Sequence, residues 1–573
     1  MYNRFIRFIL KGFNPSLTLI GTFLIMAGAI ALLAASKPKV DFFPEADPLY
    51  VNIFVELPFG ADIEATNPAT KEIETKINKV IEPYESIVES VLTLIGENTT
   101  DPNQPPEPGV TPYRARITVT FLEYKFRNGI STRDILNKIS EEIQGHPGVN
   151  ITVDQNANGP PTGKPVNLEI RGDDVDSLIV ISNNLLKDIE GQNINGIEEL
   201  QVDMQLEKPE LLVDIDREAT RRYGISTGQI ATALRTSVFG KEISKFKVGE
   251  EEYPIMLRLS EDSRNNITDL INQRITFRDQ TDGRIKQVPI SSVASFRYST
   301  TYNTIKRTET TRVITLASNV TEGYNANQIV AELEDYLRGY PLPDGYSYVF
   351  TGEQKQQAED SAFLGTAFLV ALFIIFIILV TQFNSIYSPF IIILSVVFST
   401  IGVFLGYAIT GKTINVIFTG VGIISLAGIV VNNAIVLIDY INLLIQRKKE
   451  SMEVAKLADL SRADVKECII EGGATRLRPV ILTAITTVLG LIPLAIGFNF
   501  NFFSFVRELD PQFFLGGDNT AMWGPMAWTI IYGIIFATFL TLLVVPAMYW
   551  LAYRLKTVTF GKRSRPKEVI IAD

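Results

Sequence analysis

The sequence predicts an α+β membrane protein with six transmembrane helices and a large domain outside the membrane. The chain has 573 residues, of which 46% are hydrophobic, which is too apolar for an ordinary soluble protein of this length. From Ser361 to Gly411 there is no charged residue and no histidine, enough for two spans of about 20 residues each. A long polar stretch with alternating strand and helix patterns separates this region from one apolar segment near the N-terminus. We therefore expect one helix, then the polar domain, then five helices.

The positions of the six spans follow from the same length rule. The uncharged stretch supplies two of them, with a turn at "TQFNSIYSP". The first span has a basic start, as a cleaved signal peptide would, but its apolar run is long and "LLAASKPKVDFFPE" is a poor cleavage site. This favours a retained anchor helix. The four spans outside the uncharged stretch are Leu17–Leu33, Ile417–Ile445, Val480–Phe498 and Trp528–Tyr549.

The orientation follows from the basic residues of the short loops, which stay on the cytoplasmic side. The N-terminal segment carries three basic residues, the loop Gln446–Arg478 holds eight, and the tail after Tyr553 holds six. The other side offers only Lys412 and Arg507 in its short connections. Both termini are therefore expected in the cytoplasm, and the block from about Lys37 to Asp360 outside the membrane.

The charge and the rare residues exclude several classes of function. The net charge is −10 while the cytoplasmic pieces are basic, so the outer domain is acidic, which argues against nucleic acid as a partner. The single cysteine, Cys468, lies in the cytoplasmic loop, so the outer domain is no disulfide scaffold. With one histidine, His146, a conventional zinc site is not expected, and we predict no metal or cofactor. No nucleophile–base set or phosphate loop is apparent, so an enzyme is the least expected class.

The first part of the outer domain alternates strands and helices. Two period-two runs, "VNIFVEL" (Val51–Leu57) and "ARITVTF" (Ala115–Phe121), are typical of half-buried strands. A helix is predicted at Thr66–Ile81 between them, and a second at Thr132–Gln144 leads into the strand "VNITVDQ". The long polar loop "GENTTDPNQPPEPGVTP" (Gly96–Pro112) is either functional or flexible padding.

The pattern then repeats. "VNLEIRG", a helix near Asp176–Ile189, "EELQVDM" and "LLVDID" precede "VITLASNV", a helix at Asn325–Leu337 and "YSYVFTG". Two such βαβ–βαβ units predict two split ferredoxin-like folds, each packing helices on one sheet face. The stretch Arg217–Ile305 has its own helix, "STGQIATALR", and a hairpin pattern, so we interpret it as an inserted subdomain.

Two adjacent asparagines, Asn432 and Asn433, occur in a segment otherwise apolar enough for lipid. Asparagine cannot exchange a proton at physiological pH, and Asp439, the acid of the same helix, lies roughly 10 Å toward the cytoplasm. These polar residues are either packing contacts between helices or part of an ion pathway. Helical spacing places Ser425, Gly428, Asn432, Val436 and Asp439 on one face, and Thr483, Thr487 and Gly490 on one face of the next span.

This architecture and four motifs resemble one half of a resistance–nodulation–division (RND) transporter. "GIVVNNAIVLIDY" resembles a motif of the fourth helix of the half, and "RLRPVILTAITTVLGLIPL" resembles the segment that follows it. "FVELPFGADIEAT" and "DREATRRYGIST" are similar to the multidrug branch, which exports hydrophobic and amphiphilic molecules. Complete members of the family carry two such halves.

The resemblance also implies roles for the intramembrane residues. The N-terminal half of the family usually carries two aspartates that bind the transported proton, and the C-terminal half often has a lysine followed by asparagine. The acids are missing at Asn432–Asn433, which resembles a C-terminal half, and the lysine of that half is missing too, so no direct role of the pair in proton coupling is expected. The asparagines are then expected to hydrogen-bond acids supplied by another half, in a separate chain or in the same one, since Met1 is either a true start or a fragment boundary. The expected polar relay is Asn432, Asn433, Thr483, Thr487, Arg476 and Asp439.

By the same resemblance, the expected function is the inner-membrane permease half of a proton-driven efflux pump for amphiphilic small molecules. Such pumps are trimers in the lipid bilayer that work with a periplasmic adaptor protein and an outer-membrane channel. Two alternatives stay open: a non-transporting RND-like assembly or scaffold subunit, and a Sec-associated export membrane component. The loop of the first unit corresponds to the family's substrate switch loop, with Gly96, Glu97, Asn98 and Pro108 as the expected residues.

The predicted domains follow from these assignments. The membrane part comprises residues 1–37, with the cytoplasmic N-terminus and first helix, and residues 356–555, with the other five helices, followed by a cytoplasmic tail at 556–573. The periplasmic part comprises a first porter subdomain at 38–160, a second at 161–216 and 306–355, and an inserted docking subdomain at 217–305.

Overall fold

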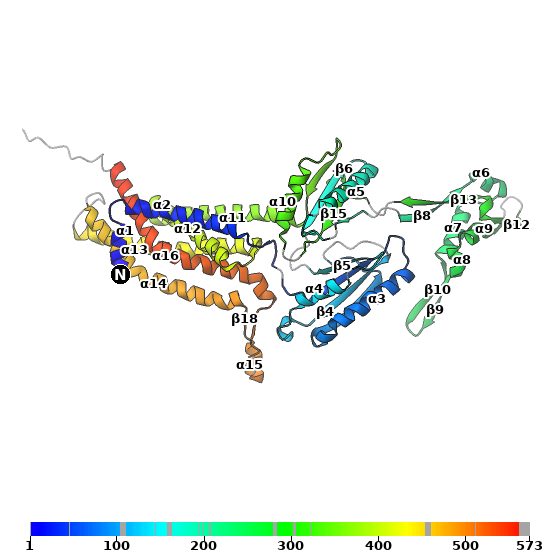
Figure 1. The fold of residues 1–573 in the computed structure, drawn as a ribbon, viewed down its shortest axis with the longest axis horizontal. Coiled ribbons are helices and arrows are strands. Elements are labelled where there is room, and N and C mark those ends of the chain that lie inside the picture. The colour runs from blue at the N-terminus through cyan, green and yellow to red at the C-terminus, as the bar shows by residue number, and fades with distance from the viewer. Residues whose placement is uncertain are drawn as a thin grey trace, which may run out of the picture. The chain divides into compact units, whose positions relative to one another are not determined.

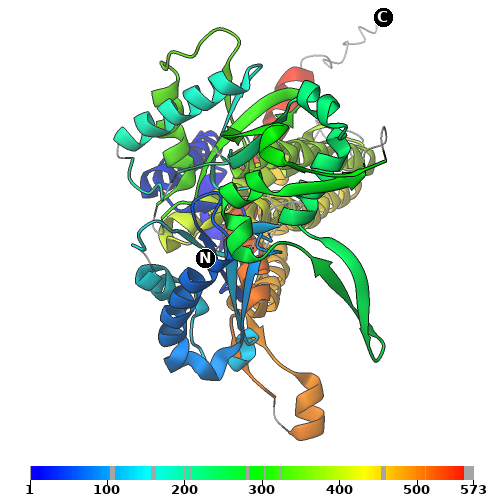
Figure 2. The same cartoon turned by 90° about the vertical axis from the view of Figure 1, so that its right-hand side faces the viewer.

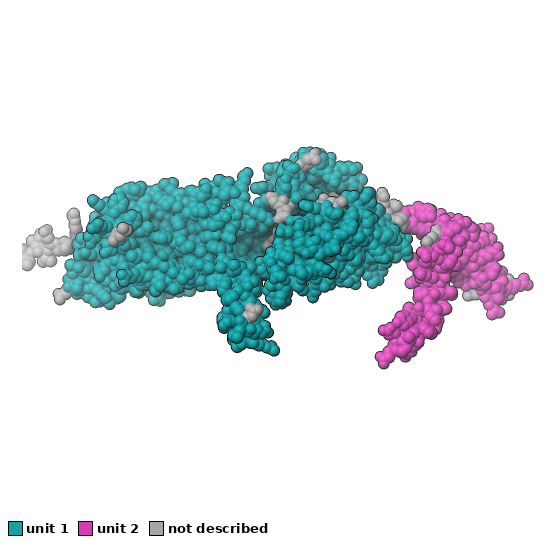
Figure 3. Space-filling model, turned by 60° about the horizontal axis from the view of Figure 1, so that its bottom comes forward, with its two compact units in different colours: residues 1–203, 307–573 teal, residues 204–306 magenta. Residues whose placement is uncertain are grey.

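The computed structural model describes most of the chain as two compact units. One unit comprises residues 1–203 and 307–573, and the other comprises residues 204–306, shown in separate colours in Figure 3. The described residues are 2–44, 46–102, 110–143, 145–156, 163–192, 194–198, 200–204, 208–278, 283–301, 305–321, 324–452, 460–509 and 511–560.

The larger unit contains a bundle of long apolar helices (Figure 1). Among the described residues, 6 helices are long and apolar enough to cross a membrane, and each predicted span falls on one of them. The span predicted to end at Phe498 extends two residues beyond its helix. The helix ends at Ile496, because Gly497 adopts a left-handed backbone conformation. The helices are α2 (Asn14–Ser36), α11 (Glu353–Phe383), α12 (Tyr387–Thr410), α13 (Val416–Ser451), α14 (Arg462–Ile496) and α16 (Asp518–Phe560).

The bundle has inner and outer helices. Helices α12, α13 and α16 form its centre, where Ile401, Leu426 and Val545 are fully buried. At Gly402 of α12, an added Cβ would collide with the backbone oxygen of Tyr532, so the absence of a side chain allows α12 and α16 to approach closely. Helices α2, α11 and α14 instead expose rows of Leu, Ile and Phe. The short α1 (Tyr2–Ile9) packs against α14 and α16.

The first sheet has the connectivity βαββαβ. Its strand order is β3-β4-β2-β5, with antiparallel neighbours, and the helices α3 and α4 pack on it through buried Ile73, Ile77 and Ile139. The sequence patterns did not predict β3, because its apolar residues show no clear period of two and only part of the strand is buried. The elements are β2 (Tyr50–Glu56), α3 (Ile63–Ile81), η1 (Glu82–Ile87), β3 (Val88–Gly96), β4 (Thr111–Phe121), η2 (Tyr124–Phe126), α4 (Thr132–Ile143) and β5 (Asn150–Gln155).

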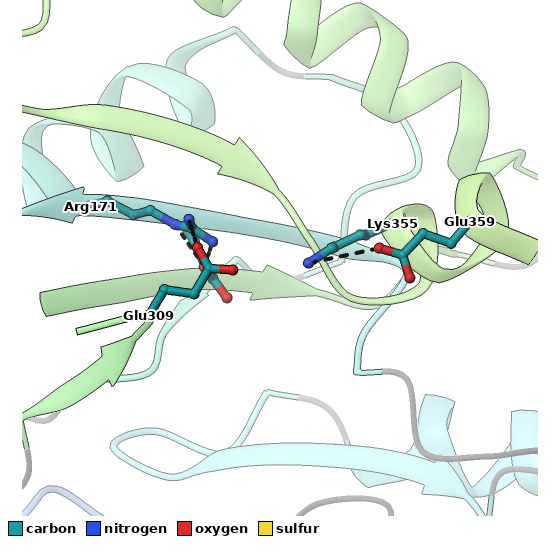
Figure 4. Close-up of polar contacts among 5 residues, drawn as sticks. Arg171, Glu309, Lys355 and Glu359 are labelled. Carbon is teal, nitrogen blue, oxygen red and sulfur yellow. Dashed lines mark hydrogen bonds and ion pairs between the residues drawn. The ribbon is translucent and has the colours of Figure 1, made fainter. Parts of the chain in front are cut away.

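The second sheet repeats this arrangement with one additional strand. Its order is β14-β15-β6-β16, and β7 pairs with β15. Arg171 of β6 contacts Glu169 at 2.9 Å and Glu309 at 3.8 Å, and Lys355 contacts Glu359 at the start of α11 (Figure 4). The elements are β6 (Val166–Gly172), α5 (Val175–Gly191), β7 (Gln201–Val202), β14 (Lys306–Thr308), β15 (Thr311–Ser318), α10 (Ala326–Leu337) and β16 (Ser347–Phe350).

The smaller unit has its own core, which includes Ile230, Ile290 and Val293. The run "LLVDID", predicted as part of the second sheet, lies in β8, which instead pairs along its whole length with β13. The compact unit therefore begins before residue 217, where the predicted insertion starts. The elements are β8 (Lys208–Ile215), α6 (Arg217–Tyr223), α7 (Thr227–Val238), β9 (Lys241–Val248), β10 (Glu251–Leu257), α8 (Glu261–Asn265), α9 (Ile267–Asn272), β11 (Arg274–Arg278), β12 (Ile285–Pro289), η3 (Ile290–Ser292) and β13 (Ala294–Thr301).

Two short strand pairs lie at the end of the bundle that is nearer the sheets. β1 (Val40–Asp41), just after the first long helix, pairs in parallel with β17 (Ile414–Asn415), between α12 and α13. β18 (Phe498–Asn499) pairs with β19 (Phe514–Leu515), and the short helix α15 (Phe502–Glu508) lies between them.

Candidate functional site

The polar face predicted on α13 lies on the outside of the bundle. Ser425, Gly428, Asn432 and Asp439 are exposed and Val436 is half-buried, whereas the opposite side of the helix is packed against its neighbours. We call these five residues the polar stripe. Within the part of the chain that the structure describes, the Asn432 side chain has no hydrogen-bond partner. An exposed amide on a helix apolar enough for lipid requires a partner from elsewhere.

Asn433, not Asn432, makes the contact between the two polar helices. Asn433 is buried, and the Thr483 hydroxyl of α14 donates to its Oδ1 at 3.3 Å. Thr483 also lies 2.9 Å from the Val480 carbonyl oxygen, so its hydroxyl is shared between two acceptors. The structure therefore joins α13 and α14 through Asn433 and leaves Asn432 outside the contact.

The remaining predicted relay residues divide into two groups. Thr487 donates to the Thr483 carbonyl at 2.8 Å, so its hydroxyl is satisfied within its own helix. Arg476, toward the other end of the bundle, places its guanidinium over the Tyr440 ring at 4.5 Å. Neither Arg476 nor Asp439 forms an ion pair with the residues described here, and the buried Nε of Arg476 has no partner among them. The predicted relay is thus not a continuous chain of hydrogen bonds.

Small residues accompany the stripe. A Cβ added at Gly428 of α13 or at Gly490 of α14 would meet nothing within 4 Å. In contrast to Gly402, these glycines do not accommodate another part of this chain. They leave shallow surface beside Asn432 and Thr483 on which another helix can approach closely.

The predicted switch loop connects two neighbouring strands of the first sheet, away from the bundle helices that carry the stripe. Gly96 ends β3 with φ +80°, and Asn98 also has a positive φ of 54°. The Thr99 and Thr111 hydroxyls lie 2.9 Å apart, and Arg116 donates to the Thr100 carbonyl at 2.7 Å, so the base of the loop is held at both ends. Glu97 lies in this base, and Pro108 lies outside the described residues.

A second group of polar side chains in the bundle was not predicted. The Tyr407 hydroxyl lies 2.8 Å from the Thr529 hydroxyl and 3.1 Å from the Thr419 hydroxyl. It also donates to the Pro525 carbonyl at 3.1 Å. Tyr407, Thr419 and Thr529, which we call the hydroxyl cluster, are all buried and come from α12, α13 and α16. The sequence signal was weak, because the three residues come from different helices and no spacing along one helix links them.

The chemistry available at the stripe is limited to amides, hydroxyls and one peripheral carboxylate. Amides and hydroxyls orient water or pair with a carboxylic acid, but they do not change charge near neutral pH. Across the residues that the structure describes, no group of three or more His, Cys, Asp or Glu is arranged to hold a metal ion. The stripe alone therefore provides no proton carrier at the level of Asn432.

Comparison with known proteins places the chain among membrane transporters. Residues 1–553 match the family model described as "AcrB/AcrD/AcrF family". The chain is 29% identical over 428 residues to the cobalt-zinc-cadmium resistance protein CzcA of Cupriavidus metallidurans, which covers 74% of this chain and 37% of the relative. It is 25% identical over 567 residues to protein HelA of Legionella pneumophila, covering 96% of this chain and 49% of the relative.

A further relative is the swarming motility protein SwrC of Bacillus subtilis, 30% identical over 334 residues, or 58% of this chain and 28% of the relative. The crystal structure of a heavy metal efflux pump, crystal form II, has the same fold, with a TM-score of 0.73 and 22% identity. That alignment covers 96% of this chain and 51% of the pump chain. The chain thus spans less than half the length of these curated relatives.

Proposed function

The chain belongs to the AcrB/AcrD/AcrF family of RND permeases, and on this premise we propose that it is the inner-membrane permease half of a proton-driven efflux pump. The other half, in a second chain or in the same polypeptide, supplies the acids that bind the transported proton. The observation that carries this proposal is the polar stripe, which is exposed on the bundle and has no protonatable group beside Asn432.

The free-energy cost of an unpaired amide supports a second half at the stripe. Lipid tails offer no hydrogen-bond partner, and an amide left without one costs roughly 2 kcal/mol or more. A helix with carboxylic acids, packed on the open surface at Gly428 and Gly490, would provide partners for Asn432 and Thr483. In that complex the asparagine would hold and hydrate the acid, while the acid would carry the charge change.

The proposed placement has both termini in the cytoplasm and six helices across the inner membrane, one before and five after a periplasmic part. In the periplasm, the two βαβ sheets serve as the porter subdomains and the smaller unit as the docking subdomain. Reporter fusions after Lys37 and at Asp360 should read as periplasmic, and fusions near Lys448 and Lys567 as cytoplasmic. A cytoplasmic signal at Asp360 would overturn the placement and the domain roles with it.

For the substrate we propose amphiphilic small molecules. Cys, Met and His side chains are the ligands that soft and borderline transition-metal ions prefer, and this chain has one cysteine, one histidine and 8 methionines. Cys468 is buried on the proposed cytoplasmic side, where it could not collect a periplasmic ion. Heavy-metal ions are the second candidate, favoured by the names of CzcA and of the efflux pump with the same fold.

The partners proposed for the complete pump are those expected of this family. The assembly is a trimer in the bilayer, and its periplasmic part meets an adaptor protein that leads to an outer-membrane channel. Cross-linking of the full chain in cells that also make candidate adaptors tests this arrangement, with cysteines placed on exposed β9 and β10 of the smaller unit.

Transport in vesicles under an imposed pH gradient tests the function. This chain alone should move neither an amphiphilic dye nor Zn²⁺ or Co²⁺, whereas addition of a half with intramembrane acids should produce movement of the dye. In the complete assembly, Asp439→Asn should have little effect, because Asp439 lies away from the level of Asn432. Movement of dye by this chain alone, abolished by Asp439→Asn, would refute the half-transporter proposal.

The scaffold alternative predicts a different outcome of the same assay. The missing acids favour a subunit that assembles with other proteins without transporting. In that case the two halves would associate, but the assembly would move neither dye nor metal ion, and Asn432→Leu would change association only. Transport of metal ions in place of dye would keep the pump and replace the substrate.

A further inference from the structure

The connection between α14 and α16 carries a group of phenylalanines that the function above does not use. The described residues 498–509 and 511–515, which we call the phenylalanine arm, include β18, α15 and β19. The two strands pair at Phe498–Leu515 and Asn499–Phe514, and Asn499 donates to the carbonyls of Gly497 and Gly516. These bonds fix the base of the arm to the ends of the two long helices.

A small aromatic cluster holds the arm together. The Phe500 ring lies 4.4 Å from that of Phe502, 5.6 Å from that of Phe505 and 5.2 Å from that of Phe513, measured between centroids. The Phe498 ring contacts Phe513 at 5.6 Å. Phe500 is therefore the internal contact of the arm, and the other rings surround it.

The outward side of the arm is apolar and exposed. Phe503 is 90% exposed, Leu509 82%, Val506 79% and Phe502 71%. Four large apolar side chains exposed to this degree on one short segment are unusual for a surface in contact with water. Phe502 and Val506, four residues apart, lie on one face of α15 with Phe503 next to it, and Leu509 follows directly after the helix.

The arm projects sideways from the end of the bundle (Figure 1). In Figure 1 the helices run horizontally and α15 extends below their ends, and in Figure 2, seen along the bundle, the arm again extends away from it. The level of the arm is that of the C-terminal end of α14 and the N-terminal end of α16. If those helices cross a membrane, this level is the outer boundary between lipid and water, and the arm extends along it.

The apolar surface of α14 continues into the arm. Leu489 is 60% exposed, Ile496 43% and Phe498 48%, so the apolar outer face of the helix continues to the base of the arm. An outer face of this kind on a membrane helix meets lipid. From this continuity, and from the direction of the arm, we propose that the phenylalanine arm lies in the outer interface of the bilayer, with Phe502, Phe503, Val506 and Leu509 inserted among the lipids.

The arm also touches the first sheet. Tyr124, between β4 and α4, donates its hydroxyl to the Leu515 carbonyl at 3.2 Å, and its ring lies 6.2 Å from that of Phe514. A Cβ on Gly516 would collide with the Tyr124 hydroxyl, so this contact is close. An arm held in the lipid interface thus fixes the height of the first sheet above the membrane through Tyr124.

This inference rests on the proposed placement of the helices in the membrane, and one experiment tests both separately. The full chain with Cys468→Ala and a single new cysteine is labelled with an environment-sensitive fluorophore and reconstituted in phosphatidylcholine vesicles. The vesicles contain lipid with a quenching nitroxide either near the headgroup or in the middle of the acyl chain. Three positions are compared: Phe503→Cys on the arm, Glu508→Cys on the same helix, and Phe373→Cys in the middle of α11.

The label at position 503 should be quenched by the shallow nitroxide about twofold more than by the deep one, because interfacial helices insert only about 5–10 Å. The label at position 508 should be quenched less by both lipids. At position 373 the deep nitroxide should be the stronger quencher. Val506→Cys repeats the arm measurement should Phe503→Cys fail to fold.

The possible failures are distinguishable. Loss of deep quenching at position 373 would overturn the membrane placement itself. Normal quenching at 373 with a water-like, unquenched label at 503 and 506 would overturn only the arm. A label at 503 that is shielded from water but not quenched by either lipid would show that a protein surface, such as a second copy of this chain, covers the arm, and would also overturn the lipid proposal.

Discussion

The hydroxyl cluster and the polar stripe place similar groups in the same apolar bundle with opposite results. Tyr407, Thr419 and Thr529 are buried, come from three helices, and satisfy one another and a backbone carbonyl. Asn432 lies on the outside of α13 with nothing in the described chain to bond. A polar residue in an apolar helix therefore does not by itself indicate a transport site. What matters is whether the bundle that contains it already supplies its partners.

The largest expected effect is at the hydroxyl cluster. Tyr407→Ala removes a fully packed ring and should lower the free energy of unfolding by about 3 kcal/mol, in the range measured for large aromatic deletions. Tyr407→Phe keeps the ring and should lower it by about 1 kcal/mol, because interhelical hydrogen bonds in membranes are weak. Unfolding of the detergent-solubilised chain by denaturant measures both. Equal losses for the two variants would show that the hydroxyl, not the ring, stabilises the bundle.

A half-buried acid outside the bundle extends the comparison to the first sheet. Asp154 of β5 is half-buried, and burial raises its pKa to about 6, against the opposing hydrogen bond from the Gln155 amide at 2.7 Å. The folded state therefore binds the proton of the Asp154 carboxyl more tightly than the unfolded chain does. The stabilisation of the fold by this proton is complete below about pH 4 and is lost as the pH rises through about 6.

Asp154→Asn should therefore increase the free energy of unfolding by about 2 kcal/mol at pH 8 and change it little at pH 4. Thermal unfolding at the two pH values measures this difference. Glu142→Gln, an exposed carboxylate on α4, is the matched control and should behave like the wild type at both. If Asp154→Asn increased the free energy of unfolding equally at both pH values, the effect could not be due to proton binding at Asp154.

Within the candidate site, the two asparagines should differ. Asn433→Leu removes the acceptor of the Thr483 hydroxyl and should lower the free energy of unfolding of this chain by about 0.6 kcal/mol, as expected for one interhelical hydrogen bond. Asn432→Leu should leave that free energy unchanged, yet impair transport by the complete assembly at least as much as Asn433→Leu. If Asn432→Leu weakens helix association while transport persists, the packing interpretation of the stripe is correct.

The smallest effect is expected where exposed polar groups face water. Lys355 and Glu359 lie 4.0 Å apart and are both more than half exposed, so Lys355→Ala should change the free energy of unfolding by about 0.3 kcal/mol or less. The same denaturant assay provides the measurement. A decrease in the free energy of unfolding near that of Tyr407→Phe would show that the Lys355–Glu359 pair stabilises the start of α11. It would also contradict the expected difference between polar groups facing water and polar groups within the bundle.

The sequence predicted the parts of this fold that a periodic pattern reveals. The apolar spans and the helices of both sheets follow from spacing along one helix or strand, and the same spacing groups Asn432 with Ser425 and Gly428, although it did not predict that this face is exposed. The hydroxyl cluster could not be predicted in this way, because Tyr407, Thr419 and Thr529 meet only through the register of three helices. For the same reason, the sequence alone could not decide whether Asn432 or Asn433 accepts the hydrogen bond of the Thr483 hydroxyl. The structure shows that the acceptor is Asn433.

The phenylalanine arm was missed for a different reason. Its aromatic residues directly follow an apolar helix, so composition makes them look like an extension of the span ending at Phe498. The helix ends earlier because Gly497 turns the backbone, and the Asn499 and Gly516 contacts direct the chain sideways. Such a turn depends on contacts with a segment that follows it by several residues, which periodicity does not detect.

The parallel pair of β1 and β17 has a consequence for how the protein is made. Val40 pairs with Ile414, and α2 packs against α12 and α16, although both sheets and the smaller unit are synthesised between them. At synthesis rates of about 5–20 residues per second, these roughly 300 residues delay this meeting by about half a minute. During that interval the packing face of α2 has no partner helix in the bilayer. Chaperones and membrane proteases can therefore bind or degrade the nascent chain at this stage.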